Sequence, residues 1–244
     1  MKKEPDLKQK YGIVAMVDAL GVRNATIEQS TNFVQRIGDI VELVAGFVSS
    51  YLKERNKHKT TIPQIITFGD TLVISWEMKS DLLPDYLPDV GIFLSYLIAL
   101  GLDGNLAFRG AISVGDFIQH GATVLGPVVS DVAAWYDSAE MIGIIATPYC
   151  GQFLSDINET RNLTSMEFVK YNVPLKGDVS KNLWVVPWPK MLLEAQFFGA
   201  VKGKTPFQIY YKLIEQLSIP KGTENKYINT ETFVRQIVRQ KFEK

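Results

Sequence analysis

The chain has few of the residues that build disulfides and zinc sites. Its 244 residues include one cysteine, Cys150, and two histidines, His58 and His120. A single cysteine cannot form an internal disulfide, and two histidines so far apart match no zinc-binding pattern. We expect Cys150 to be a small buried side chain, because no histidine lies near it in the sequence. The charged start, MKKEPDLKQK, is unlike a signal peptide, so we expect a cytoplasmic protein.

The chain also lacks a charge imbalance and a long hydrophobic run. It carries 26 basic and 26 acidic residues, so no overall field attracts nucleic acid or an anionic membrane. The longest nearly apolar run, residues 90–102, is shorter than the roughly 20 residues that cross a bilayer, and it predicts a buried helix. With 46% hydrophobic residues, the chain can bury one sizeable core. We therefore expect a globular protein with neither nucleic acid nor a membrane as its partner.

The order of hydrophobic patterns predicts an α+β fold. The expected elements are a strand at 11–17, a helix at 26–53, a hairpin at 65–75, a helix at 87–100, a bent strand at 105–118, a helix at 127–141, a strand at 143–146, a helix from 147 and a strand pair near 169–188. This order is typical of a mainly antiparallel sheet with helices over it. We assign residues 1–189 to this domain. Residues 190–244, with helical patterns at 191–200, 206–217 and 230–242, form a predicted C-terminal helical extension.

An aspartate interrupts two β-rich runs in the segment IITFGDTLVIS, residues 65–75. Phe-Gly-Asp between such runs predicts an antiparallel hairpin with Asp70 at its tip. Asp70 could simply accept hydrogen bonds from its own turn, as most turn aspartates do. A second carboxylate, Asp18, ends the first predicted strand, 52 residues earlier. If the strands are neighbours in the sheet, Asp18 and Asp70 meet at the same edge.

Two carboxylates at one edge predict a metal site. Close carboxylates repel and raise each other's pKa, so keeping both ionised needs a cation between them. Mg²⁺ fits best, because it is commonly held by one or two carboxylates together with a substrate's phosphates. The loop after Asp18 adds backbone N–H groups around Gly21 that could bind phosphate oxygens. The pattern therefore indicates a metal and a nucleotide.

Several motifs in this order resemble the class III nucleotide cyclases. Asp18 in VDALG and Asp70 in FGDTLVIS match the two metal-binding aspartates of that family, and RGAISVGDFIQHG resembles its Gly-rich strand. The resemblance runs from about residue 11 to 188 and is closest to the bacterial branch that includes the pyrimidine cyclases of anti-phage defence. It implies a ferredoxin-like class III core and conversion of a nucleoside triphosphate to its cyclic monophosphate and pyrophosphate. It also implies two Mg²⁺ or Mn²⁺ ions and a homodimer whose subunits share each site.

The resemblance assigns roles to further residues. The substrate-binding residues that it implies are Ala19, Leu20, Gly21, Val22, Ile66, Thr123, Asp131 and Lys176. Lys176, in VPLKG, matches a phosphate-binding lysine, unless it is only a solvated turn lysine. Ile66 and Thr123 stand where adenylate cyclases have the Lys and Asp that contact adenine, and this neutral pair favours UTP or CTP over ATP and GTP. Thr123, Asp131 and, in one arrangement, Arg109 would approach the site from the partner subunit.

One expected residue is missing from the third helix. Class III cyclases usually carry an Asn and an Arg there, and VVSDVAAWYDSAE has no Arg. Arg109 and Arg23 are candidates to stabilise the transition state instead, although Arg109 could equally be a structural arginine paired across the sheet. The alternative function is a catalytically inactive cyclase-like module that binds a nucleotide or a partner protein. A phosphodiesterase or a polymerase-type two-aspartate site on a similar core is a third possibility.

Overall fold

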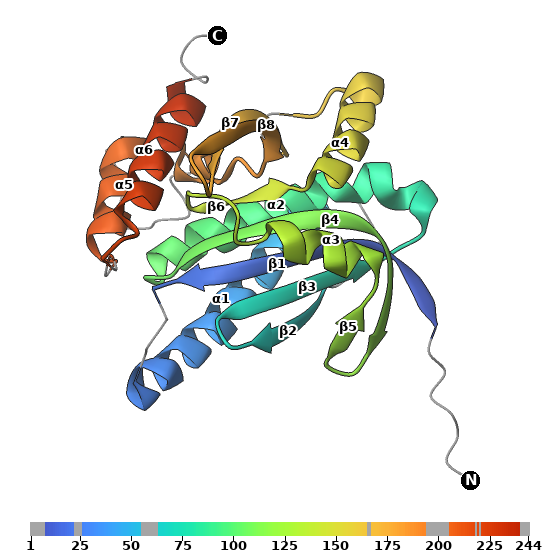
Figure 1. The fold of residues 1–244 in the computed structure, drawn as a ribbon, viewed down its shortest axis with the longest axis horizontal. Helices are drawn as coiled ribbons and strands as arrows, with labels where there is room; N and C mark the ends of the chain where they lie inside the picture. Colours follow the sequence, from blue (N-terminus) through green and yellow to red (C-terminus); the bar gives the residue numbers. More distant parts are fainter. Residues whose placement is uncertain are drawn as a thin grey trace.

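A mainly antiparallel sheet of eight strands runs through the molecule and carries helices on both faces (Figure 1). The computed structural model describes residues 8–21, 26–54, 63–164, 167–193, 205–217, 219 and 221–239. The strands are β1 (Gln9–Leu20), β2 (Gln64–Phe68), β3 (Thr71–Glu77), β4 (Ala107–His120), β5 (Thr123–Leu125), β6 (Gly143–Ala146), β7 (Val169–Leu175) and β8 (Val179–Val185). They follow the order β2-β3-β1-β4-β6-β8-β7, with β5 paired to β4.

The two faces of the sheet carry helices of different length. The described helices are α1 (Ile27–Glu54), η1 (Ser80–Leu82), α2 (Leu83–Asp103), α3 (Pro127–Trp135), α4 (Pro148–Arg161), η2 (Trp188–Leu193), α5 (Pro206–Glu215) and α6 (Glu224–Arg239). The long helices α1 and α2 lie behind the sheet in Figure 1, and the short α3 lies in front of it. Trp76 of β3 packs edge-on against Phe93 of α2, with 5.4 Å between ring centroids, which closes the core on that side.

The first half of the fold is a ferredoxin-like unit. β1 is its central strand and pairs antiparallel with β3 on one side and β4 on the other, while β2 pairs antiparallel with β3 at the edge. Two helices, α1 and α2, make the crossovers, as in the split β-α-β arrangement. β4 and β6 are parallel, and the other strand pairs are antiparallel. The predicted α+β class is therefore confirmed.

One helix combines length with an apolar composition. In the described part of the chain, Ser80–Asp103 alone is long and apolar enough to cross a membrane, judged only by its length and composition. However, 83% of its apolar window is buried inside the protein. Every residue from 90 to 102 is buried, so the predicted buried helix is confirmed.

The third helix is shorter than the sequence predicted. It ends at Trp135, whereas the pattern had suggested residue 141. Ser138 donates to the Trp135 carbonyl from both its backbone N–H and its hydroxyl, which closes a turn there. Ala139 then bridges to Leu175 of β7. Tertiary pairing with β7 therefore replaces the last turns of the predicted helix.

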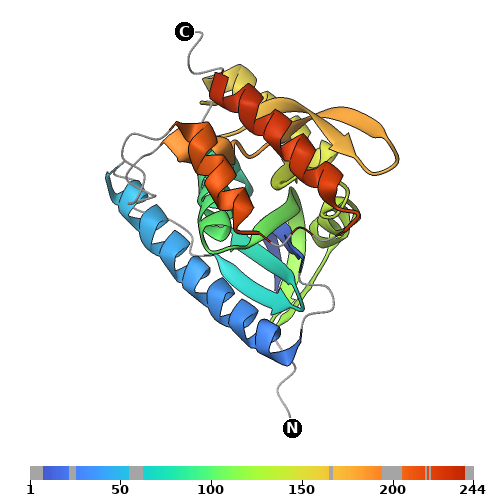
Figure 2. The same cartoon turned by 90° about the vertical axis from the view of Figure 1, so that its left-hand side faces the viewer.

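The C-terminal helices pack on the same hydrophobic core as the sheet. Phe233 of α6 contacts Tyr171 of β7 with 4.7 Å between ring centroids, and both belong to one cluster of buried residues. Figure 1 shows α5 and α6 at one end of the molecule, and in Figure 2 this end faces the viewer. α6 begins at Glu224, six residues before the predicted helix, and the helix predicted at 191–200 is a 3₁₀ helix as far as Leu193, beyond which residues 194–204 lie outside the described residues. The domain boundary at residue 189 stays a prediction.

Candidate active site

Asp18 lies near the end of the central strand, on the sheet face that carries α3. It pairs with Thr71 of β3 on one side and with Arg109 of β4 on the other. Directly opposed residues of neighbouring strands share a face, so these three side chains lie together. Ser113 of β4 is on this face too, because it donates to Asp131 of α3. The first candidate acid is therefore held in a strand with neighbours on both sides.

The turn of the β2–β3 hairpin holds Asp70 beside Asp18. Gly69 takes the first turn position with a φ of 60°, which suits the type II′ turns that favour glycine there. The Asp70 carbonyl accepts a hydrogen bond from the Ala19 N–H at 2.9 Å, which ties the turn to β1. Within the described chain, the Asp70 carboxylate makes no hydrogen bond to its own turn, so no contact supports the simple turn role. The structure thus brings the two acids together, as the strand order predicted.

The pKa of Asp18 depends on its burial and on the charged groups beside it. Burial raises the pKa of Asp18 above its usual range, and the negative charge of Asp70 raises it further, whereas the charge and hydrogen bond of Arg109 oppose this. The Asp18 side chain is only 16% exposed. A net upward shift means that Arg109 does not fully offset burial and the second acid. The pair therefore favours binding of a further cation.

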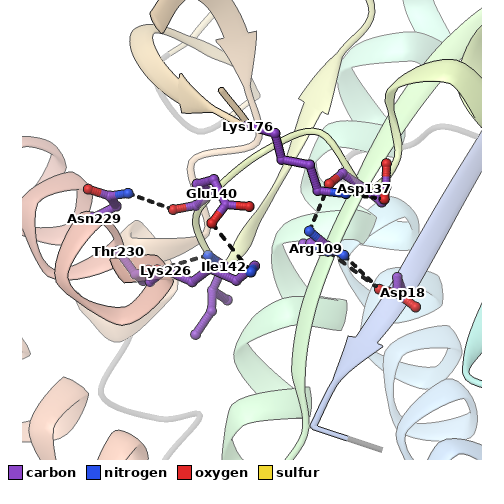
Figure 3. A network of polar contacts seen from close by, with 9 residues as sticks. All are labelled: Asp18, Arg109, Asp137, Glu140, Ile142, Lys176, Lys226, Asn229 and Thr230. Atoms are coloured by element: carbon purple, nitrogen blue, oxygen red, sulfur yellow. Dashed lines mark hydrogen bonds and ion pairs between the residues drawn. The ribbon is translucent and has the colours of Figure 1, made fainter. Parts of the chain in front are cut away.

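Arg109 connects Asp18 to the loop after α3. Its Nε and Nη2 each lie 3.4 Å from Oδ2 of Asp18, and its Nη1 donates to the backbone carbonyl of Asp137 at 2.7 Å (Figure 3). The Arg109 side chain is 11% exposed. It is paired with Asp18 across the sheet, as the structural alternative expects, and it also lies beside a candidate acid, as a catalytic role requires. Arg109 therefore reaches Asp18 within its own chain, without a partner subunit.

Lys176, in the turn between β7 and β8, joins the same network. It forms an ion pair with the Asp137 carboxylate (Figure 3). Burial alone would raise the pKa of Asp137, but the hydrogen bond and charge of Lys176, together with the charge of Arg109, lower it. Half of the Lys176 side chain is exposed, so its ammonium group stays open to solvent while it pairs with Asp137. A phosphate-binding role for Lys176 stays a prediction.

The two acids offer donors that suit a small divalent ion. In the described part of the chain, no group of three or more His, Cys, Asp or Glu side chains could hold a metal. Mg²⁺ does not need such a cage, because one or two carboxylates, water and substrate phosphates usually complete its shell. Among the described residues, Arg109 bonds Oδ2 of Asp18, so Oδ1 and the Asp70 carboxylate remain as oxygen donors. The residues present therefore fit a magnesium or manganese ion completed by a substrate.

The predicted phosphate loop is described only in part. Ala19 is buried and its N–H already donates to Asp70, so its observed contact positions the second acid and leaves no donor for phosphate. Leu20 is the last residue of β1, and Gly21 follows with a φ of 89°, a conformation that favours glycine. Two further candidates, Val22 and Arg23, lie outside the described residues.

The two residues predicted to face the base lie on different hairpins. Ile66 is half-buried in β2, and strand alternation places it on the same sheet face as Asp18. Thr123 is exposed in β5, opposite His120, at the end of β4 that lies away from Asp18. The structure does not bring Thr123 and Asp18 together within one chain. The predicted role of Thr123 therefore requires a second subunit.

Asp131 is engaged within its own chain. Its Oδ2 accepts hydrogen bonds from the hydroxyls of Ser113 at 2.6 Å and Thr147 at 2.7 Å. Both hydroxyl-bearing residues are fully buried. These bonds hold α3 on the sheet, because withdrawing the half-buried Asp131 carboxylate would take an acceptor from two buried hydroxyl groups. A contact from Asp131 to a partner's substrate stays a prediction.

Asp137 is the member of the network that the sequence did not reveal. Its backbone carbonyl binds Arg109 and its carboxylate binds Lys176. A backbone acceptor leaves no trace in residue type, and a helix extended to residue 141 would have used that carbonyl internally. The available signal was the Asp-Ser pair directly after an apolar helical run, which is typical of a turn.

Comparison with known proteins gives matches in structure only. The chain matches no protein-family model and no curated protein. The solved structures that it resembles include the catalytic core of a rhodopsin-guanylyl cyclase with converted specificity in complex with ATPalphaS, at 11% identity and a TM-score of 0.49, over 74% of this chain and 98% of that one. They also include an adenylate/guanylate cyclase/hydrolase from Silicibacter pomeroyi, at 14% identity and a TM-score of 0.45, over 74% of this chain and 98% of that one.

A third such structure is the adenylyl cyclase CyaB from P. aeruginosa, at 13% identity and a TM-score of 0.39, over 74% of this chain and 95% of that one. These proteins are adenylyl and guanylyl cyclases by name. Superpositions this loose say nothing about substrate or chemistry, which have to be argued from this chain's own residues.

Proposed function

We propose that the chain is a nucleotide cyclase, which converts a nucleoside triphosphate to its 3′,5′-cyclic monophosphate and pyrophosphate. The observation that carries this proposal is the pairing of Asp18 and Asp70, with Arg109 bonded to Asp18 and Lys176 linked to Arg109 through Asp137. Paired acids hold divalent ions, and basic side chains bind phosphates. In the reaction, the ribose 3′-oxygen bonds to the α-phosphorus, the bond from that phosphorus to pyrophosphate breaks, and the hydroxyl proton leaves to solvent.

Each side chain has a distinct part in this reaction. Asp18 and Asp70 would hold two Mg²⁺ or Mn²⁺ ions, which when bound would lower the pKa of the ribose hydroxyl and offset phosphate charge. Arg109 turns from Asp18 toward the α-phosphate, and Lys176 turns from Asp137 toward the terminal phosphates. Each cation exchanges a carboxylate partner for a phosphate, so neither is left unpaired. Placing such charges in advance is usually the largest part of the catalysis of phosphoryl transfer.

The proposed substrate is a pyrimidine nucleotide, UTP or CTP. Ile66 offers no hydrogen bond and Thr123 can donate or accept one, which suits the smaller polar edge of a pyrimidine. The distance between Thr123 and Asp18 within one chain supports the proposal of a homodimer with two shared sites. Phe68, 82% exposed at the hairpin, offers apolar surface for a second copy. A cytoplasmic location is proposed from the low cysteine content, and a role in signalling against phage from the sequence resemblance alone.

Product analysis tests the proposal. The full chain is incubated with UTP, CTP, ATP or GTP and Mn²⁺, and mass spectrometry identifies the nucleotide products. We expect a cyclic pyrimidine monophosphate and pyrophosphate, no product from Asp70→Asn, and unchanged product from Asp103→Asn, which alters an exposed carboxylate at the end of α2. Absence of a cyclic product from all four nucleotides would refute the cyclase. Hydrolysis of cyclic nucleotides or extension of a primer would establish the third possibility.

A second candidate function has its own supporting observation. Asp131 is turned inward to Ser113 and Thr147, and α3 contains no arginine. Both features suit a cyclase-like module that binds a nucleotide or a partner protein without turnover. Tight, divalent-dependent nucleotide binding without any product would favour this module over the enzyme.

A further inference from the structure

α6 is bonded to the loop that leads away from α3. This loop, residues 136–142, runs from Tyr136 to Ile142 and is called the α3–β6 loop below. Asn229 donates its side-chain N–H to the Glu140 carbonyl at 2.8 Å, and the Thr230 hydroxyl accepts from the Ile142 N–H at 2.8 Å. Lys226 forms an ion pair with the Glu140 carboxylate at 3.3 Å (Figure 3).

Two of the α6 residues that contact the loop are buried, so they hold the loop firmly. Thr230 is fully buried and Lys226 is 9% exposed. Ile142 is also buried, and without Thr230 its N–H would lose its partner away from water. The Ile142 carbonyl accepts from the indole of Trp188 at 3.2 Å. The C-terminal end of the loop is therefore fixed from both sides of the backbone.

The other end of the same loop holds the cations of the candidate site. The carbonyl of Asp137 accepts from Arg109, and its carboxylate pairs with Lys176. Between the two ends, the Glu140 N–H donates to the Pro174 carbonyl and the Lys176 N–H donates to the Ser138 carbonyl, both at 2.9 Å. Only a few residues of the loop thus separate the α6 contacts from the Asp137 carbonyl, which orients the Arg109 guanidinium. Figure 3 shows the two clusters on one loop, with Asp18 beyond Arg109.

We propose that α6 is a positioning element of the site, acting through Asn229 and Thr230 on the α3–β6 loop to set the direction of the Arg109 guanidinium. Arg109 has a planar fork whose donors are divided between the Asp18 carboxylate and the Asp137 carbonyl. A shift of the carbonyl changes that division and rotates the fork relative to Asp18. Displacements of about 1 Å at a catalytic group cost on the order of a hundredfold in rate. The catalytic consequence rests on the proposed function, while the geometric consequence does not.

The test compares two threonines of α6. Thr230→Val removes the hydroxyl that binds the loop, whereas Thr232→Val removes an exposed hydroxyl that bonds only its own helix, at the Ile228 carbonyl. Asn229→Ala is a second variant at a half-buried position and threatens the fold less. Thermal unfolding of each variant establishes that it is folded.

The first readout needs no activity. The Nε–H signal of Arg109, assigned by its loss in Arg109→Lys, is followed by ¹⁵N NMR in the full chain. We expect it to shift and to exchange faster with water in Thr230→Val and Asn229→Ala, and to stay in place in Thr232→Val. An unchanged Arg109 signal in folded Thr230→Val and Asn229→Ala would overturn the proposal, whether or not the chain is a cyclase.

The second readout separates positioning from general support. If the chain makes a cyclic product, Thr230→Val should lower kcat by about tenfold or more with little change in KM. In an Arg109→Lys background the same change should have almost no further effect, because the group that it positions is already altered. If the fold losses in kcat of Thr230→Val and Arg109→Lys multiply in the double variant, α6 acts independently of Arg109. That result would refute the inference.

Discussion

Binding of a divalent ion by Asp18 and Asp70 should be visible in the stability of the protein. Without an ion, Asp18 has a raised pKa in the folded state, so its ionisation costs stability as the pH rises from its unfolded value of about 3.9 toward its folded value. At neutral pH that cost is present, and Asp18→Asn should remove it. We therefore expect the ion-free Asp18→Asn protein to unfold at a higher temperature than the parent, even though Arg109 loses a partner.

When an ion is bound, the parent should instead be more stable than Asp18→Asn. At a concentration about 100 times Kd, Mn²⁺ stabilises the form that binds it by about 2.7 kcal/mol, which in a protein of this size is an increase in Tm of about 5 to 11 °C. The parent and Asp103→Asn should show the increase, and Asp18→Asn and Asp70→Asn should not. Calorimetry with and without Mn²⁺ at pH 7 measures both effects. Asp70→Asn keeps a residue suited to the turn, so a full ion response in that variant would refute the metal site.

Three further predictions concern other parts of the chain. Asp137→Asn should lower stability at pH 7 by no more than about 1 kcal/mol, because the Lys176 pair is partly exposed. Since the pKa of Asp137 is lowered in the folded state, unfolding curves should show the difference shrinking once the pH falls below the unfolded pKa of about 3.9, and vanishing only below the lower folded pKa. Replacing Ile66 by Lys and Thr123 by Asp together should raise the reaction rate with ATP relative to UTP, and each single change should raise it less. A parent protein that already prefers ATP would contradict the pyrimidine assignment. Burial raises the pKa of the Cys150 thiol, so a thiol reagent at pH 8 should modify it only after unfolding, as mass spectrometry can show.

The sequence predicted the parts of the site that depend on strand order. Asp18 and Asp70 could be placed together because each ends or joins a strongly β-like run and consecutive strands tend to be neighbours. Arg109 was a candidate because its strand was expected near the first one. The link through Asp137 was not predictable, since it depends on where α3 stops. That point is set by the bridge from Ala139 to β7, and local helical spacing carries no information about it.

In the C-terminal part, too, the sequence pattern predicted a helix but not its tertiary contacts. Helical periodicity revealed that a helix would form near residue 230, but it placed the start six residues late and left Asn229 outside. Lys226 and Asn229 are polar, so they contribute nothing to an apolar pattern. Their role becomes evident only when the Glu140 segment lies beside them.

The hydrogen bond between the Ala19 amide and the Asp70 carbonyl has a consequence for rates. It fastens the hairpin tip to the central strand, so the two carboxylates keep their separation whether or not an ion lies between them. An ion can then enter and leave without any backbone rearrangement, and its exchange is set by how fast it sheds water. Mg²⁺ gives up its water reluctantly, so Mn²⁺ should reach binding equilibrium sooner than Mg²⁺ at a site of this rigidity. After the protein is mixed with either ion, the time that binding takes to reach equilibrium, rather than the final occupancy of the site, would then distinguish Mg²⁺ from Mn²⁺.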